Sequence, residues 1–190
     1  MKLLDVRALT LVLFSLSIAC GPKPMPSVDT ALTLEGSDGR AHVLSEELAR
    51  RDITVLMFYS TWCPSVKAHR ARVAELVRRY EPRGVKIYWV HSNDGAEPAR
   101  DAQLAKEQPI PLLTDADGKL ARKLGVEYAT HSVILDRHGD VRYSGAFDSD
   151  KHHMRTDATP HLANAIDDVL AGRQPARGPE PLGCPLDLDR

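Results

Sequence analysis

The sequence predicts an α/β fold in which a mixed β-sheet carries helices on both faces. Three observations support this prediction. Residues 53–59 are almost continuously apolar, which is typical of a central strand covered on both sides. Residues 64–80 follow with apolar side chains on one helical face and arginines mostly on the other. Strand and helix patterns then alternate along the chain, and a β-hairpin pattern and a closing helix pattern come after them.

The other elements follow from local patterns. Residues 31–35 and 41–44 flank a Gly-Ser-Asp-Gly turn and predict a small hairpin. The remaining predicted elements are a short helix over 45–50, a strand over 85–90, a helix over 98–106, a short strand at 112–113, a helix over 115–124, a hairpin of 132–135 with 141–143, and a last helix over 160–170.

The first 19 residues predict a signal peptide. They hold two basic residues and then an apolar stretch, residues 8–18, that is too short to span a bilayer. Ala19-Cys20-Gly21 resembles the processing site of bacterial lipoproteins, which predicts cleavage before Cys20 and its acylation. Ordinary signal cleavage nearby is the alternative. Residues 20–27 would then be a lipidated cysteine and a Pro-rich tether. We therefore expect an exported protein anchored to a membrane of the cell envelope, with its domain in the periplasm or outside the cell.

The rest of the chain predicts one folded domain, residues 28–172, and a Pro/Gly-rich tail, residues 173–190. We expect the tail, which carries Cys184, to be mobile and to lie outside the core. The formal net charge is −1, and no basic stripe with interleaved aromatic residues occurs. Nucleic acid is therefore not an expected partner, and the membrane is expected only through the lipid anchor.

Cys63 is the main candidate for chemistry. It lies where the apolar strand ends and the amphipathic helix begins, flanked by Thr61, Trp62 and Pro64. The positive end of a helix dipole stabilises a thiolate, the form of cysteine that attacks disulfides and peroxides. A common dithiol pattern places a second cysteine three residues on, where this chain has Val66. The alternative interpretation is a buried, inert cysteine.

The number of cysteines suggests a partner for Cys63. If Cys20 carries lipid, only Cys63 and Cys184 remain, and an exported compartment permits them to pair. Our hypothesis is that the tail folds back and that Cys184 resolves Cys63 by forming a disulfide. A permanent structural disulfide and an intermolecular bridge are the alternatives.

The order of elements, with Trp62-Cys63-Pro64 at the first long strand–helix junction, resembles the thioredoxin-like fold. Within it, the chain resembles the redoxin family, which includes TlpA-like and peroxiredoxin-like (AhpC-TSA-like) proteins. The resemblance covers roughly residues 28–170 and implies a thiol-disulfide oxidoreductase without an organic cofactor. Its partners would be protein or small-molecule thiols and disulfides, or peroxides. Further segments that carry the resemblance are residues 90–93, 125–130, 133–136, 142–148 and 183–185.

The chain also departs from these families. Thr130 occupies the place of the cis-proline that faces the cysteine in thioredoxins, so we expect a trans peptide there. Leu56 and Ser60 stand where peroxiredoxins carry proline and threonine. We therefore do not assign the complete activity of either thioredoxins or peroxiredoxins to this chain. An antioxidant, peroxiredoxin-like thiol peroxidase and a non-catalytic thioredoxin-like scaffold remain as alternatives.

His131 follows Thr130 in the loop that faces the cysteine in this fold. It is a candidate for tuning or protonating Cys63, although a surface histidine is the plainer interpretation. The segment faintly resembles Sco-type copper chaperones, which place two cysteines four positions apart. That second position is Lys67 here, so a copper-binding module is only a further alternative. We assign no metal ligands.

Overall fold

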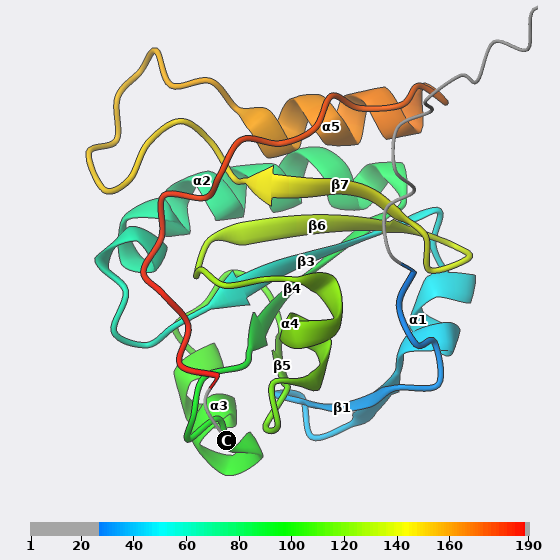
Figure 1. Ribbon diagram of the computed structural model, residues 1–190, viewed down its shortest axis with the longest axis vertical. Coiled ribbons are helices and arrows are strands. Elements are labelled where there is room, and N and C mark those ends of the chain that lie inside the picture. The colour runs from blue at the N-terminus through cyan, green and yellow to red at the C-terminus, as the bar shows by residue number, and fades with distance from the viewer. Residues whose placement is uncertain (1–26, 189–190) are drawn as a thin grey trace, which may run out of the picture.

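The computed structural model describes residues 27–188 and contains one seven-stranded sheet with the order β2-β1-β5-β4-β3-β6-β7 (Figure 1). The strands are β1 Thr33–Gly36, β2 Ala41–Val43, β3 Ile53–Tyr59, β4 Val85–His91, β5 Leu112–Thr114, β6 His131–Asp136 and β7 Val141–Ala146. β3, β4 and β5 run parallel, whereas β6, β7, β1 and β2 join by antiparallel pairing. The sheet is therefore mixed, as predicted from the sequence.

The helices are α1 Leu44–Ala49, α2 Pro64–Tyr80, α3 Pro98–Ala105, α4 Lys119–Leu124 and α5 His161–Leu170, and a 3-10 turn, η1, spans Glu81–Arg83. They cover both faces of the sheet. Buried side chains of α2 and α5 share one core cluster, and those of α1 and α4 share the other. No helix within residues 27–188 is long and apolar enough to cross a membrane.

The central strand β3 divides these two clusters. Successive side chains of a strand point to opposite faces, so Met57 faces α2 and α5 whereas Leu56 and Phe58 face α1 and α4. Every residue of β3 is buried, which explains its continuous apolar pattern. Cys63 belongs to the cluster of Met57. The candidate nucleophile therefore lies on the α2 face of the sheet.

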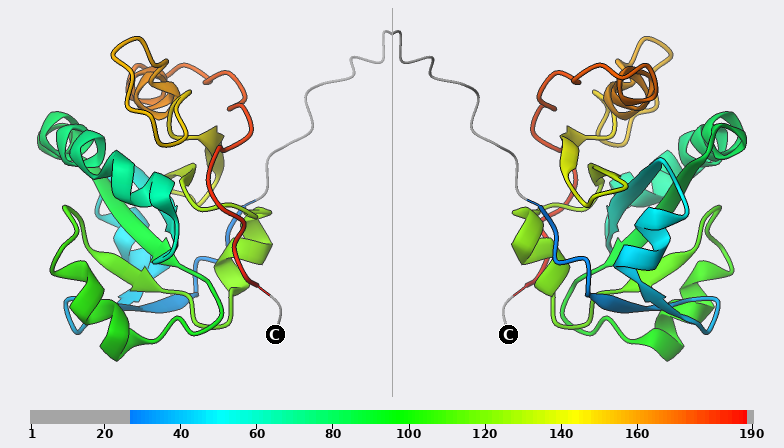
Figure 2. Two further views of the ribbon diagram at one scale, coloured as in Figure 1. Left: turned by 90° about the vertical axis from the view of Figure 1, so that its left-hand side faces the viewer. Right: turned by 90° about the vertical axis from the view of Figure 1, so that its right-hand side faces the viewer.

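The C-terminal tail lies against the domain, where the sequence led us to expect a segment apart from the core. It runs along β7 and then across the ends of the strands toward α4 (Figure 2). The Ala146 N–H donates to Pro179 O at 2.9 Å, so the tail covers part of the edge strand. Gly178 permits this approach, because a Cβ there would lie 2.6 Å from the Cα of Gly145. The composition of the tail predicted a mobile segment. Composition does not show that the edge of β7 is free to pair with it.

Candidate active site

Cys63 is the N-cap residue of α2, one position before Pro64, the first helical residue. Its side chain is only 3% exposed, whereas the neighbouring Trp62 is 81% exposed and Thr61 is half-buried. The β3–α2 connection therefore buries the sulfur and presents a large aromatic ring to solvent beside it. An exposed tryptophan at this position offers an apolar contact to a docking partner.

The Cys63 sulfur accepts a main-chain hydrogen bond from the tail and lies beside the first N–H groups of α2. The main-chain N–H of Cys184 lies 3.3 Å from Cys63 Sγ, and both cysteines are free thiols. Burial alone would raise the pKa of the Cys63 thiol. Hydrogen bonds from the Cys184 thiol and from the N–H groups of Val66, Cys184 and Ser65 outweigh that effect, so this pKa lies below its ordinary value. The site thus favours a thiolate at Cys63.

Cys184 has the opposite character. Burial and the hydrogen bond to Cys63 raise the pKa of its thiol to about 11. Cys184 therefore holds its proton more tightly than Cys63 does. The structure brings together the two cysteines that the sequence singled out, 121 positions apart, one as an acceptor and the other as a donor.

Main-chain pairing holds the tail over this site. Cys184 O accepts from the Ala129 N–H at 2.8 Å, and the Leu186 N–H donates to Glu127 O at 2.8 Å. Further along, the Asp187 N–H donates to Asn93 Oδ1 at 3.3 Å. Cys184 and Leu186 also pack against the core. Residues 184–187 therefore form a strap across the end of the sheet, close to Cys63.

Gly183 provides a direct test of this strap. A Cβ at Gly183 would lie 1.6 Å from Ala129 O, a main-chain atom that cannot move aside cheaply. We expect Gly183→Ala to lift the strap and to raise the rate of Cys63 alkylation by iodoacetamide several-fold, measured by mass spectrometry of the full chain. Leu182→Ala, at an exposed neighbouring side chain, should leave that rate unchanged. Equal rates in wild type and Gly183→Ala would contradict the strap geometry.

Thr130 approaches the site through its backbone. It has a left-handed conformation with φ of 66°, and its N–H donates to Phe58 O at 2.8 Å. The described residues contain no cis peptide bond, so the predicted trans peptide is confirmed. Gly183 lies against Thr130, because a Cβ there would come within 2.9 Å of Thr130 Oγ1. Thr130 therefore contacts the strap.

His131 lies on the other face of the sheet from Cys63. The next residue, Ser132, pairs with Met57 on the α2 side, so alternation along β6 turns His131 toward α4. His131 Nε2 is 2.7 Å from Ser144 Oγ, and its Nδ1 is buried without a partner. Burial lowers the pKa of His131 to about 4. A ring on the far face of the sheet is not placed to tune or protonate Cys63, the role considered from the sequence.

His131 should make stability depend on pH. Its pKa is about 4 when folded and 6.5 in the unfolded chain, so between these values only the unfolded chain binds the proton. The stabilisation is complete above pH 6.5 and is lost as the pH falls toward 4, by about 2 kcal/mol at pH 5. Urea unfolding should show that the free energy of unfolding of wild type falls between pH 7 and pH 5. In His131→Gln the fall should be smaller by about 2 kcal/mol. The same difference in both proteins would contradict it.

No three histidine, cysteine, aspartate or glutamate side chains within residues 27–188 come together in a way that could hold a metal ion. Cys63 and His131, the pair considered for copper, lie on opposite faces of the sheet. The geometry of the described chain therefore gives no support to the copper-binding alternative. Cys20, the predicted lipidation site, lies outside the described residues.

Three side chains near the site were not predicted from the sequence. His69 and Asp148 form a buried pair beside the first turn of α2, and Asn93 joins Ser60 to the strap. His69 lies among the buried positions of α2, between Val66 and Val73. A histidine on the apolar face of a helix that begins at the candidate nucleophile was the available signal. Asp148 and Asn93 occupy loops, and only the tertiary structure shows their partners.

Comparison with protein families matches residues 22–162 to the Redoxin model. The chain belongs to the Redoxin family. The resemblance inferred from residues around Cys63 is thereby confirmed. Among curated relatives, the thiol:disulfide interchange protein DsbE of Pseudomonas aeruginosa is 26% identical over 150 residues, which covers 78% of this chain and 79% of that protein.

Solved structures agree with this assignment. An uncharacterized conserved protein from Geobacillus kaustophilus superposes with a TM-score of 0.73 at 26% identity, covering 86% of this chain and 92% of that one. A thioredoxin-like protein from Aeropyrum pernix gives a TM-score of 0.54 at 17% identity, covering 75% and 89%. The second likeness shows the fold alone. The thioredoxin-like fold predicted from the sequence is confirmed.

Proposed function

We propose that this redoxin is an exported thiol–disulfide oxidoreductase, with Cys63 as the nucleophile and Cys184 as the resolving cysteine. The observation that carries the proposal is the contact between the Cys184 N–H and Cys63 Sγ at 3.3 Å. Both cysteines are free, and the pKa of Cys63 is lowered whereas that of Cys184 is raised. The Pseudomonas aeruginosa relative is a thiol:disulfide interchange protein, which supports the same class of chemistry.

The first step is attack by the Cys63 thiolate on one sulfur of a partner disulfide. A Cys63–partner disulfide forms, the partner's own S–S bond breaks, and the partner's other sulfur leaves as a thiolate. Contacts with Ser65, Val66 and Cys184 lower the pKa of Cys63 and so favour its thiolate before the attack. Trp62, exposed beside the sulfur, contributes apolar contact with the incoming chain.

The second step uses the proton that Cys184 has kept. Once Cys63 is in a disulfide it no longer bears negative charge, so one cause of the raised pKa of Cys184 disappears. Cys184 then gives its proton to solvent and attacks Cys63 Sγ as a thiolate. The Cys63–Cys184 disulfide forms and the partner leaves as a second thiolate. The partner gains two electrons, this protein loses two, and an external dithiol returns it to the reduced state.

We expect this chemistry to take place in the cell envelope. Export and acylation of Cys20 are predicted by sequence patterns that lie outside the described residues. A Pro-rich tether after Cys20 would hold the domain close to the membrane while leaving it free to meet partners. Protein or peptide disulfides in that compartment are the proposed substrates.

The test supplies the full chain, in a Cys20→Ser background, with a disulfide-bonded peptide and an excess of dithiol. We expect catalytic reduction of the peptide and a transient Cys63–peptide adduct detected by mass spectrometry. A parallel reaction replaces the peptide with hydrogen peroxide. Rapid Cys63 sulfenic acid formation with no peptide reduction would overturn the exchange reaction in favour of the peroxidase alternative. Inertness toward both would leave the scaffold interpretation.

A further inference from the structure

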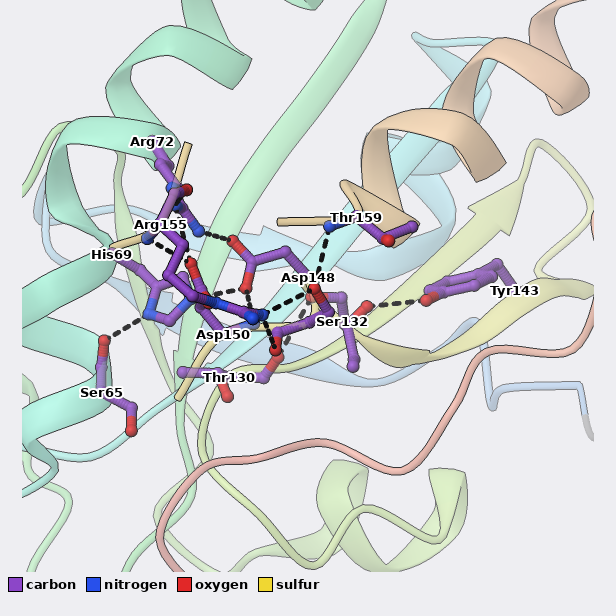
Figure 3. Close-up of polar contacts among 12 residues, drawn as sticks. Ser65, His69, Arg72, Thr130, Ser132, Tyr143, Asp148, Asp150, Arg155 and Thr159 are labelled. Carbon is purple, nitrogen blue, oxygen red and sulfur yellow. Dashed lines mark hydrogen bonds and ion pairs between the residues drawn. The ribbon is translucent and has the colours of Figure 1, made fainter. Parts of the chain in front are cut away.

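A buried polar cluster lies beside the first turns of α2 and, apart from Ser65, involves no residue used in the proposed reaction steps (Figure 3). His69, which is 1% exposed, lies at its centre. Its Nδ1 is 2.6 Å from Ser65 O, and its Nε2 is 3.0 Å from Asp148 Oδ1. The edge of the ring packs against Phe147, with centroids 5.3 Å apart. The cluster therefore joins α2 to the loop that follows β7.

Both ring nitrogens of His69 face acceptors. A neutral imidazole carries one N–H, whereas the imidazolium carries two. Burial alone would raise the pKa of Asp148, but hydrogen bonds from His69, the Asp150 N–H and Arg72 hold it below its ordinary value. Asp148 is therefore a carboxylate and, like the Ser65 carbonyl, can only accept. The geometry is satisfied only if His69 donates from both nitrogens and carries a positive charge.

Other charged groups fix this pair in place. Arg72, also on α2, forms ion pairs with Asp148 and, at 2.8 Å, with Asp150 Oδ2. Arg155, from the loop before α5, donates from Nε to Asp150 Oδ1 at 2.6 Å, and Asp157 lies 4.0 Å from it near the surface. The loop and the helix are thus joined by alternating charges, and His69 is the member nearest the start of α2.

The start of α2 is the part that contacts the candidate nucleophile. The N–H groups of Ser65 and Val66, at the start of the helix that Cys63 caps, lower the pKa of its thiol, although Cys63 forms no side-chain cap hydrogen bond. His69 holds the carbonyl of the same Ser65. A rotation of this turn would therefore alter the donors to the sulfur and the contact with His69 together.

We propose that His69, held by Asp148, is a positioning residue for Cys63. It fixes the first turn of α2 so that the Ser65 and Val66 N–H groups stay directed at the sulfur, and it places a buried positive charge on the same helix. Burying ions is costly, and an apolar pair of similar volume often serves stability equally well. The charged pair is better accounted for by its effect on the thiolate. This inference rests on Cys63 acting as the nucleophile proposed above.

The experiment compares the pH dependence of Cys63 alkylation by iodoacetamide in the full chain, in a Cys20→Ser background, with peptide-level mass spectrometry. The variants are His69→Gln and Asp148→Asn. We expect each to raise the pKa of Cys63 by about one unit, so that the alkylation rate at pH 7 falls by up to about tenfold while the rate at pH 10 is unchanged. The Cys184 thiol is followed in the same spectra.

Tyr80→Phe is the matched control. Tyr80 is on the same helix, and its hydroxyl lies 3.0 Å from both Ala163 O and an Asp167 carboxylate oxygen, so its loss weakens the packing of α2 on α5. It should lower the melting temperature without moving the alkylation profile. A His69→Gln protein that behaves like Tyr80→Phe would overturn the positioning role.

Two further readouts keep the outcomes separate. Nitrogen NMR of the wild-type ring at pH 7 should show both His69 nitrogens protonated, and a neutral tautomer would overturn the proposal even if the variants fail to fold. An ordinary thiol profile for wild-type Cys63 would instead contradict the activated nucleophile of the proposed function, and the inference would fall with it. If the alkylation profile of wild-type Cys63 shows a lowered pKa and His69→Gln and Asp148→Asn do not change it, the positioning role of His69 is overturned. The proposed function is then unaffected.

Discussion

Replacing Cys63 by serine is expected to abolish catalysed disulfide reduction, with a fall of at least about 10³-fold in kcat/KM. A serine hydroxyl at the same N-cap remains protonated at neutral pH, because the hydrogen bonds that favour a thiolate cannot compensate for its far weaker acidity. No adduct with the peptide disulfide should form. The measurement is steady-state reduction of a disulfide-bonded peptide, together with intact mass of the protein after quenching with acid.

The control for this variant is the fold itself. Cys63 is small and 3% exposed, and serine is close to it in size, so the melting temperature should change little. A Cys63→Ser protein that is folded and still reduces the peptide at the wild-type rate would show that the reaction does not pass through Cys63. The nucleophile would then have to be sought elsewhere in the chain.

Replacing Cys184 by serine should have a different consequence, because the first step survives and the second does not. We expect one rapid turnover followed by arrest, with the Cys63–peptide disulfide accumulating to about one equivalent. The serine hydroxyl can still donate to Cys63, as the Cys184 thiol does, and the main-chain N–H of residue 184 is unchanged. The first step should therefore keep roughly its wild-type rate at pH 7. Rapid-quench mass spectrometry measures the first step and the arrest.

Leu182→Ser is the matched control, since Leu182 is in the same tail, is exposed and carries no thiol. It should turn over like wild type. Cys184→Ser with undiminished turnover would mean that a second substrate thiol or the external dithiol resolves Cys63. The strap would then be a cover for the site and Cys184 would have no chemical role.

The amount of fold that the sequence predicts depends on how regular each local pattern is. The bounds of β3 and α2 were predicted correctly from residues 53–59 and 64–80, because a fully buried strand and an amphipathic helix each have a continuous hydrophobic pattern in the sequence. The tail has no such pattern. Its position depends on the free edge of β7 and on the close approach of Gly178 to Gly145, and neither is visible in the local pattern of residues 173–190.

The candidate site divides in the same way. Cys63 was identifiable because it lies at a strand–helix junction, which favours a thiolate. Cys184 was identifiable because the chain has only three cysteines. The role considered for His131 does not fit the structure, because one step along β6 turns a side chain to the opposite face. His69 and Asp148 are 79 positions apart in the sequence. Their contact is created by the packing of α2 on the loop after β7, which no local sequence pattern predicts.

The most direct test of a resolving Cys184 is a redox titration of the full chain, in a Cys20→Ser background, with thiol alkylation and intact mass at each potential. We expect Cys63 and Cys184 to alkylate when reduced. They should lose alkylation together, as a single intramolecular disulfide that forms and breaks reversibly in the folded protein. Both thiols remaining free under oxidising buffer, or a bridge that resists reduction until the protein unfolds, would contradict a resolving Cys184.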